Sequence, residues 1–403
     1  MAARVYVPLS NLRAVVIMIV VAFHSVLPYL SSQPANPFPF DAAPYRWVAF
    51  PIIDRERFFG FDLFCAWQDV SLMSLMFFLA GLFTPASLVR KGSLAYLIDR
   101  WWRIGLPFLV AAAILSPLAY YASYRVTAAD PSLEAFWRHW LALPMWPPGP
   151  AWFLWQLFFL SALVACLYAI APQSMQALDR LAGYFDDRPF AFFSSLTALS
   201  MIAYVPLAIA FSAWDWTSLG PFSFQLSRPL HYVLYFFTGV ALGSRGFDRG
   251  LLRHDGPLAR NWLILLAAAI TGFIVWGEFT SLTMPDWAAS VLPYRLAASA
   301  AFPPACAAGI LSLLAIALRL MRFEDRRLDS LSSNAYRIYL LHYVAVLWLQ
   351  YALLRIALPA IAKGIIVFSL ALALSWAASV GFGVLVKLLP GAGSRGAMLQ
   401  QRR

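Results

Sequence analysis

The sequence predicts an all-α integral membrane protein that crosses the bilayer about ten times, with both termini in the cytoplasm. Of its 403 residues, 62% are hydrophobic and only 12% are charged, and its mean hydropathy is +0.70. Soluble domains are roughly 45–50% apolar and about 25% charged, so this composition excludes an ordinary soluble protein. The apolar residues also come in long runs, as a transmembrane helix of roughly 17–25 residues requires.

Ten apolar runs follow one another along the chain. They centre on residues 10–30, 67–88, 104–123, 152–171, 191–212, 230–243, 261–278, 292–318, 333–354 and 361–387. The eighth run contains Pro303 and Pro304 and is expected to be kinked or broken there, because proline cannot continue the helical hydrogen bonds. We expect residues 1–390 to form one transmembrane domain and residues 391–403 to form a basic cytoplasmic tail.

The distribution of Lys and Arg between alternate loops predicts the orientation. Membrane proteins carry an excess of these residues in their short cytoplasmic loops. With ten spans and an inside N-terminus, most of the 30 Lys and Arg residues fall on the cytoplasmic side. The net charge of +11 is therefore attributed to topology, and no nucleic-acid partner is expected. Two outer loops, at residues 31–66 and 124–151, are long enough to cap a site, and an ordered but inert cover is the alternative.

Two ionisable residues, Arg13 and His24, lie in the first span. Ionisable groups inside a membrane are unfavourable and are therefore functional candidates. Eleven residues of α-helix make about three turns, so both side chains lie on nearly one face. They also rise roughly 16 Å, which places Arg13 near the inner surface and His24 in the outer half. A neutral imidazole there can take a proton from an alcohol as a general base. A histidine that only bonds two helices together is the structural alternative.

Asp69 opens the second predicted span at a depth comparable with that of His24. A carboxylate in that place would orient the imidazole and stabilise its charged form. Alternatively, Asp69 caps the N-terminus of its helix, where Asp is favoured. Asp62, in the preceding loop, is another candidate partner for the imidazole.

Arg100 and Arg103 stand at the cytoplasmic end of the third span. Residues three apart are neighbours on a helix surface, and two guanidiniums side by side suit phosphates or a diphosphate. The alternative is a pair of anchors whose charged ends reach the lipid headgroups.

Two further histidines are candidates for the same cavity. His342 shares a helical face with Tyr339 in the ninth span, and His231 begins the sixth span beside Arg228. Each is equally compatible with a structural role, as is Glu278 at the outer end of the seventh span. We expect no metal, because the chain has no zinc-type spacing, no phosphate-binding glycine loop and no G-x-S-x-G motif. The three cysteines, at positions 65, 166 and 306, are far apart and form no metal or disulfide pattern.

Together these residues resemble the membrane-bound acyltransferase family called acyltransferase 3. The resemblance rests on four stretches in family order, namely Arg13-x10-His24, MFFLAGLF at 76–83, RWWRIGLP at 100–107 and SSNAYRIYLLHY at 332–343. GPAWFLW, which contains Trp152, is similar to a Trp-Phe-Leu stretch of these enzymes. The chain departs from the family pattern at Ala80, where Ser is usual, and at Arg337, where a small residue is frequent. Its long outer loop is most similar to the branch resembling glucan biosynthesis protein C, which is implicated in succinylating periplasmic glucans.

The resemblance implies that an acyl group of the acetyl or succinyl class moves from cytoplasmic acyl-coenzyme A to a hydroxyl of an envelope carbohydrate, in a bacterial inner membrane. The expected partners are acyl-coenzyme A, the carbohydrate and membrane lipids. The implied catalytic residues are His24, Arg13 and Asp69, the residues for the coenzyme are Arg100 and Arg103, and those for the substrate are Trp152, His231, Tyr339 and His342.

Three alternatives remain at this point. A covalent acyl-histidine belongs to the same class of enzyme. A transporter or flippase of lipid-linked sugars suits ten spans and a broken eighth helix, although transporters commonly show paired interrupted helices. A purely structural subunit of an envelope-glycan assembly would not depend on His24.

Overall fold

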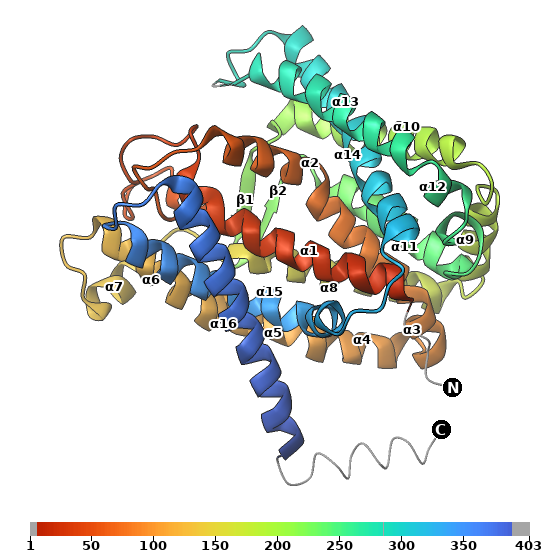
Figure 1. Ribbon diagram of the computed structural model, residues 1–403, viewed down its shortest axis with the longest axis horizontal. Helices are drawn as coiled ribbons and strands as arrows, with labels where there is room; N and C mark the ends of the chain where they lie inside the picture. Colours follow the sequence, from red (N-terminus) through yellow and green to blue (C-terminus); the bar gives the residue numbers. More distant parts are fainter. Residues whose placement is uncertain (1–5, 285, 389–403) are drawn as a thin grey trace. The chain divides into compact units, whose positions relative to one another are not determined.

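The computed structural model describes residues 6–284 and 286–388, and its regular secondary structure is almost entirely helical (Figure 1). The predicted all-α class is confirmed, and each of the ten predicted spans lies in helical structure. The predicted tail at 391–403 lies outside the described residues.

The helices run in the following order. Before the hairpin they are α1 (Val7–Val26), η1 (Leu27–Tyr29), η2 (Arg46–Val48), α2 (Phe59–Leu82), α3 (Thr84–Lys91), α4 (Ser93–Arg100), η3 (Trp101–Gly105), α5 (Leu106–Val110), η4 (Ala111–Leu115), α6 (Ser116–Thr127), α7 (Leu133–Ala142), η5 (Gly149–Ala151), α8 (Trp152–Ile170), α9 (Ser174–Gly183) and α10 (Pro189–Phe211). After it they are α11 (Pro229–Arg245), η6 (Gly250–Leu252), α12 (Pro257–Arg260), α13 (Trp262–Ser281), α14 (Leu292–Leu320), α15 (Arg326–Leu353) and α16 (Ala360–Leu388).

A short antiparallel hairpin, which the sequence analysis did not predict, joins α10 to α11. Its strands are β1 (Trp216–Leu219) and β2 (Phe222–Gln225), and Trp216 pairs with Gln225. The two-residue turn begins at Gly220, whose φ of 58° is favourable for glycine and disfavoured for other residues.

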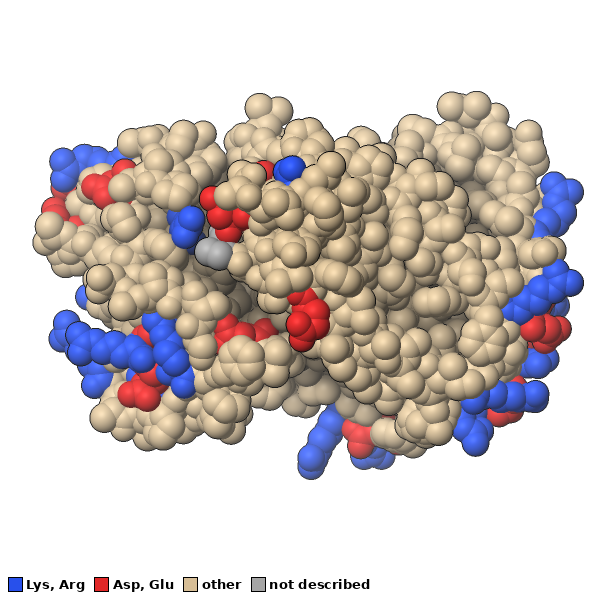
Figure 2. Space-filling model, turned by 90° about the horizontal axis from the view of Figure 1, so that it is seen from above, with Lys and Arg blue, Asp and Glu red and all other residues tan. Residues whose placement is uncertain are grey.

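Eight helical segments within the described ranges have the length and apolar composition to cross a membrane. The two other predicted spans are α11, which has only 17 residues, and α15, whose hydropathy is reduced by polar residues such as His342 and Gln350. Figure 2 shows one face on which most side chains carry no charge and the Lys and Arg residues gather towards the margins. The chain is therefore a multi-pass membrane protein, and its sidedness stays a prediction.

The chain divides into two compact units. The first unit comprises Met1–Leu12, Asp62–Ser116 and Trp140–Glu324, and the second comprises Arg13–Phe61, Pro117–His139 and Asp325–Arg403. Within the first unit α14 packs along α13 and also contacts α10. Within the second unit α15 packs along α16.

The predicted break in the eighth span is absent. Helix α14 continues through Pro303 and Pro304, and its apolar segment is largely buried. Beside this point α13 approaches closely, because a Cβ added to Gly272 would lie 2.9 Å from the Cα of Ala305. Prolines are tolerated in membrane helices where neighbouring helices compensate for the lost bond. The interrupted helix that favoured a transporter is therefore not observed.

The third span contains two π-helical turns, η3 and η4, on either side of α5. Such turns are rare and occur frequently at functional sites. The first coincides with the RWWRIGLP stretch, where a Cβ on Gly105 would lie 2.6 Å from the ring of Trp101. Glycine at this position therefore allows the Trp101 ring to lie against the helix.

The long loop that follows α1 is packed onto its own unit. Tyr120 donates a hydrogen bond of 2.7 Å to the carbonyl of Val48, and Ser123 donates one to Pro51. Lys363 forms a 2.7 Å ion pair with Asp54, and both side chains are 2% exposed. The loop is therefore ordered. This agrees with both predicted roles, a cap over a site and an inert cover.

Three glycines bring α2 and α11 into backbone contact. A Cβ on Gly81 would overlap the carbonyl oxygen of Phe236, and one on Gly239 would overlap that of Phe78. Gly243, four residues after Gly239, meets α2 in the same way, so α11 carries the small-xxx-small pattern of close membrane-helix contacts. Gly81, the glycine of the MFFLAGLF stretch, thus allows α2 and α11 to cross in close contact.

We expect Gly239→Ala to destabilise the protein by about 1–3 kcal/mol, because the added methyl group forces α2 and α11 apart. Thermal unfolding in detergent measures this. Gly277→Ala is the matched control, since a Cβ at Gly277 meets nothing within 4 Å and alanine has the better helix propensity. Equal unfolding temperatures for the two variants would contradict the close crossing.

Candidate functional site

The second unit places His24 beside His342. Helix α15 holds His342, whose Nδ1 lies 2.7 Å from the carbonyl oxygen of Tyr339. A carbonyl oxygen only accepts, so Nδ1 carries the proton and donates it. In the neutral ring Nε2 is then an acceptor, and it lies 3.2 Å from Nδ1 of His24.

The same reasoning assigns the tautomer of His24. Its Nδ1 lies 2.8 Å from the carbonyl oxygen of Val20, one turn earlier in α1. This nitrogen therefore carries a proton, which it shares between Val20 and the accepting Nε2 of His342. The Nε2 atom of neutral His24 is left with its lone pair. His24 is half-buried, whereas His342 is fully buried, so His24 presents the more accessible ring.

Neighbouring side chains of the second unit fix both the backbone and the ring of His24. Gln350 donates hydrogen bonds to the carbonyls of His24 at 2.8 Å and Ser25 at 3.2 Å. The ring of Tyr343 meets the His24 ring edge-on, with centroids 5.3 Å apart. These contacts restrict the imidazole to one orientation. Gln350 was not predicted from the sequence. It could have been found as a polar residue two helical turns after His342, on the same face of that helix.

Arg13 also contacts α15. Its Nη2 donates to the carbonyl of Ser332 at 3.3 Å, and the residue is exposed. Arg13 and His24 thus face the same helix, as their spacing predicts. Residue numbers increase in the same direction along both helices, so α1 and α15 run parallel. A parallel pair agrees with the predicted topology, in which the first and ninth spans both run outward.

Tyr339 is buried one turn before His342, and their ring centroids are 5.9 Å apart. Its carbonyl fixes the tautomer of His342, as described above. The sequence prediction that these two residues share a face and lie near His24 agrees with this geometry within the second unit.

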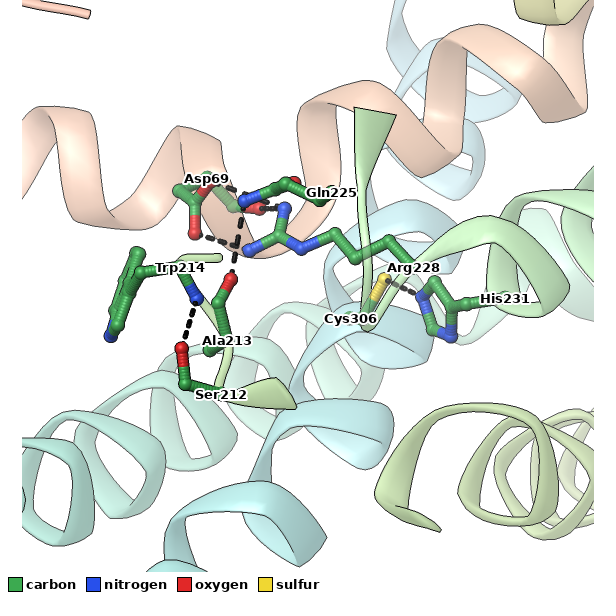
Figure 3. Close-up of polar contacts among 8 residues, drawn as sticks. All are labelled: Asp69, Ser212, Ala213, Trp214, Gln225, Arg228, His231 and Cys306. Atoms are coloured by element: carbon green, nitrogen blue, oxygen red, sulfur yellow. Dashed lines mark hydrogen bonds and ion pairs between the residues drawn. The ribbon is translucent and has the colours of Figure 1, made fainter. Parts of the chain in front are cut away.

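Asp69 lies in the first unit, where Arg228 binds it. The Arg228 guanidinium contacts Oδ2 at 2.6 Å and Oδ1 at 3.1 Å, and it also donates to the Asp69 carbonyl (Figure 3). Arg228 is 2% exposed and the Asp69 side chain 27% exposed. The helix-capping alternative for Asp69 is wrong, because α2 begins at Phe59. Asp62, which was expected in a loop, lies in the first turn of that helix. That Asp69 orients His24 stays a prediction.

His231 lies in the first unit and is fully buried. Its Nδ1 is 2.9 Å from the hydroxyl of Ser200, and its Nε2 is 3.5 Å from the sulfur of Cys306 (Figure 3 shows the second contact). Both ring nitrogens therefore have side-chain partners, which favours the structural alternative for this histidine. Trp152, the first residue of α8, packs against the rings of Trp216 and Tyr232 in the same unit.

Arg100 and Arg103 belong to a basic cluster around Asp99 in the first unit. Arg103 and Lys91 each contact the Asp99 carboxylate at 2.9 Å. Arg100 lies 4.8 Å over the ring of Tyr96, and its buried Nε has no hydrogen-bond partner. Three cations against one carboxylate leave a positive charge, so the cluster suits an anion. Asp99 was missed by the sequence analysis, although it stands four residues before Arg103, the spacing of a helical ion pair.

Across residues 6–284 and 286–388, no group of three or more His, Cys, Asp or Glu residues is arranged to hold a metal ion. Two ion pairs, Asp69–Arg228 and Asp54–Lys363, each contain at least one side chain that is 2% exposed.

Comparison with known proteins identifies one family. The model of the acyltransferase 3 family, described as an acyltransferase domain, matches residues 9–380. No curated protein and no solved structure matches the chain.

We expect Asp69→Ala to lower the stability by roughly 3–5 kcal/mol, because it leaves the Arg228 charge buried without a partner. Asp69→Leu combined with Arg228→Met should recover most of this loss, since no charge remains to be paired. Thermal unfolding in detergent tests both, with Asp215→Ala, an exposed carboxylate beside the hairpin, as control. A double variant as unstable as Asp69→Ala would contradict this account of the pair.

Proposed function

The chain belongs to the acyltransferase 3 family and is a membrane acyltransferase, and from this premise we propose that His24 is the general base of an O-acyl transfer. The donor is acyl-coenzyme A, and the acyl group is of the acetyl or succinyl class. The acceptor is a hydroxyl of an envelope carbohydrate, at a bacterial inner membrane. The observation that supports His24 most strongly is its hydrogen bond to His342, which leaves Nε2 as a base.

In the proposed reaction the acceptor hydroxyl donates its proton to Nε2 of His24 while its oxygen attacks the thioester carbonyl. A carbon–oxygen bond forms, the carbon–sulfur bond breaks, and the coenzyme leaves as a thiol after taking the proton from His24. The imidazolium that forms between these steps keeps its Nδ1 proton on Val20 and His342. A hydrogen bond from a charged donor is stronger than one from a neutral donor, so His342 stabilises the intermediate charge.

His342 acts as a positioning residue in this scheme. It selects the tautomer of His24 and accepts from the imidazolium, which are the roles that a carboxylate performs in many histidine-based sites. A neutral histidine performs them without a second ionised group in the membrane, where charges are unfavourable. We retain as proposals the catalytic roles of Asp69 and Arg13 beside His24. We also retain as proposals the substrate-binding roles of Trp152, His231 and Tyr339.

We propose that Arg100 and Arg103 bind the phosphates of the coenzyme. The support is the excess positive charge around Asp99 and the unpartnered Nε of Arg100. Arginine binds phosphate oxygens with charge-assisted and often bidentate hydrogen bonds. Arg103 is mostly exposed, and it can exchange Asp99 for a phosphate.

We expect His24→Ala to lower the rate of acyl transfer by about 10²–10⁴-fold, the usual contribution of a general base. The purified variant should remain folded, and mass spectrometry of the acylated carbohydrate measures the rate. His254→Ala, in a loop, is the matched control. Normal transfer by His24→Ala would eliminate the proposed chemistry, and an acylated His24 trapped without acceptor would favour the covalent alternative.

His342→Ala should lower kcat at least about tenfold, because His24 loses the partner that fixes its tautomer. The KM for acyl-coenzyme A should be unchanged, since His342 does not hold the donor. His342→Gln, which retains a hydrogen-bonding side chain, should recover part of kcat. A change confined to thermal stability would assign His342 a structural role instead.

Arg100→Ala and Arg103→Ala should each raise the KM for acyl-coenzyme A about tenfold, as expected for the loss of one charge-assisted contact. Neither should change the KM for an acyl-pantetheine, which lacks the nucleotide phosphates. Steady-state kinetics with the two donors measure this difference, with the exposed Arg249→Ala as control. An equal effect on both donors would support the anchor alternative.

A further inference from the structure

Helix α15 of the second unit carries a cation, Arg337, that no carboxylate neutralises. All 19 Asp and Glu residues of the chain lie in the described ranges, and none of them forms an ion pair with Arg337. The buried cations Arg228 and Lys363, by contrast, each have a carboxylate partner. Arg337 is partly exposed, so its charge reaches the surface instead of a buried acid.

Two neutral oxygen atoms hold the guanidinium of Arg337 in place. Its Nε donates to the Ser379 hydroxyl at 3.0 Å, and its Nη2 donates to Oδ1 of Asn334 at 2.9 Å. Ser379 donates to the same Oδ1 atom at 2.8 Å, so the three side chains form a closed set between α15 and α16. A guanidinium has five N–H groups, and these contacts use two of them. Nη1 makes no hydrogen bond within the described residues.

The terminal nitrogens of Arg337 lie beside a glycine of α16. A Cβ added to Gly383 would lie 3.6 Å from both Nη1 and Nη2, and its three nearest neighbours would all be Arg337 atoms. A larger side chain would therefore cover these nitrogens. The Arg337 Cζ lies 6.0 Å from the ring centroid of Phe382, which is 56% exposed. A positioned guanidinium with unused N–H groups at an exposed place is suited to an oxyanion, which it can bind with two hydrogen bonds.

This place is separate from the histidine pair. Arg337 precedes His342 by five residues, which carry an α-helix about 140° past a full turn. His342 contacts α1, whereas Arg337 contacts α16. The oxyanion is therefore not assigned to the proposed acyl transfer, and the surface of α16 indicates what kind of molecule carries it.

The surface next to Arg337 favours a phospholipid over a soluble anion. Trp376 donates from Nε1 to the Ser330 hydroxyl at 3.1 Å, one turn before Asn334 on α15, and tryptophan is enriched at the level of the lipid headgroups. Apolar residues along α16 are 42–56% exposed. Lipid chains pack on such a surface, whereas a soluble anion gains nothing from it. These residues are Leu370, Leu374, Val380, Phe382 and Val384.

We propose that Arg337 binds the phosphate of an anionic phospholipid, whose acyl chains lie along the exposed side of α16. The lipid supplies the negative charge that the second unit does not provide, while Ser379 and Asn334 position the guanidinium. Basic sites between transmembrane helices bind anionic headgroups on the cytoplasmic side, which is where the predicted topology places the beginning of α15. The site does not depend on the chemistry of His24.

Thermal unfolding of the full-length protein in detergent tests the site by titration with phosphatidylglycerol. Phosphatidylcholine with the same acyl chains is the comparison without net charge. A ligand that binds only the folded state raises the unfolding temperature, so phosphatidylglycerol should raise it more than phosphatidylcholine. Arg337→Gln should increase the apparent Kd for phosphatidylglycerol about tenfold, as expected for the loss of one charge-assisted contact. Arg326→Gln removes an exposed charge at the start of the same helix and should leave this Kd unchanged.

A second pair of variants tests the site while Arg337 and its hydrogen bonds stay in place. Gly383→Leu covers the terminal nitrogens and should also weaken the binding of phosphatidylglycerol. Gly381→Leu adds the same side chain on the same helix, where a Cβ meets nothing within 4 Å, and should leave the binding unchanged. If Arg337→Gln does not yield folded protein, this pair decides the question.

Three results would overturn the proposal. The first is equal stabilisation of the wild-type protein by the two lipids. The second is a wild-type Kd for phosphatidylglycerol in Arg337→Gln or in Gly383→Leu. The third comes from inorganic phosphate added without lipid: if it raises the unfolding temperature of the wild-type protein but not of Arg337→Gln, the site belongs to a soluble anion.

Discussion

Charged groups inside this membrane protein must find their partners within the protein itself, and much of the fold follows from that constraint. Arg228 is 2% exposed and is held by Asp69 across the contact between α2 and α11. The Gly81 and Gly239 crossing brings the two backbones together, which makes such a short bridge between the helices possible. In the second unit the pair of Asp54 and Lys363 attaches the long loop to α16. Each pair connects segments that the sequence separates widely.

The two histidines also find their partners within the protein, but they do so without an ion pair. His24 and His342 are bonded as neutral rings, and backbone carbonyls on each helix decide where their protons lie. The position of the Nδ1 proton in each ring is thus set by a backbone carbonyl of its own helix rather than by a counter-charge. In the reaction that we propose, such a pair carries an ionised ring only transiently, and the surrounding protein is already arranged to receive that charge.

The spans could be predicted because hydropathy is a local property of the chain. The shared face of Arg13 and His24 could also be predicted, since it depends only on helix geometry. Their partners on α15 could not, because a contact over more than 300 residues depends on packing that one sequence does not display. The helix start at Phe59 was missed because aromatic and polar residues alternate before the apolar run of α2.

The hairpin and the π-helical turns escaped prediction for related reasons. The hairpin between α10 and α11 is only four residues per strand, too short for a clear alternating pattern. The η4 turn, AAAIL, consists of helix-forming residues, so nothing local marks it. The η3 turn, WWRIG, contains Gly105 and precedes Pro107, but these residues predict a weakened helix and do not specify a π-helical turn. The ion pair of Asp69 with Arg228 was not predicted, because the two residues are 159 positions apart and only the folded chain brings them together.

The second unit is discontinuous, and this has a consequence for biogenesis. Its segments begin at Arg13, Pro117 and Asp325, so α1 enters the membrane long before α15 is made. At a synthesis rate of about 5–20 residues per second, the 318 residues that follow His24, up to and including His342, take roughly 15–60 s to produce. Throughout that interval the first helix carries an ionisable ring whose final partner does not yet exist. Assembly of the histidine pair therefore waits for nearly the whole chain, and a ribosome that stops before α15 releases a protein without it.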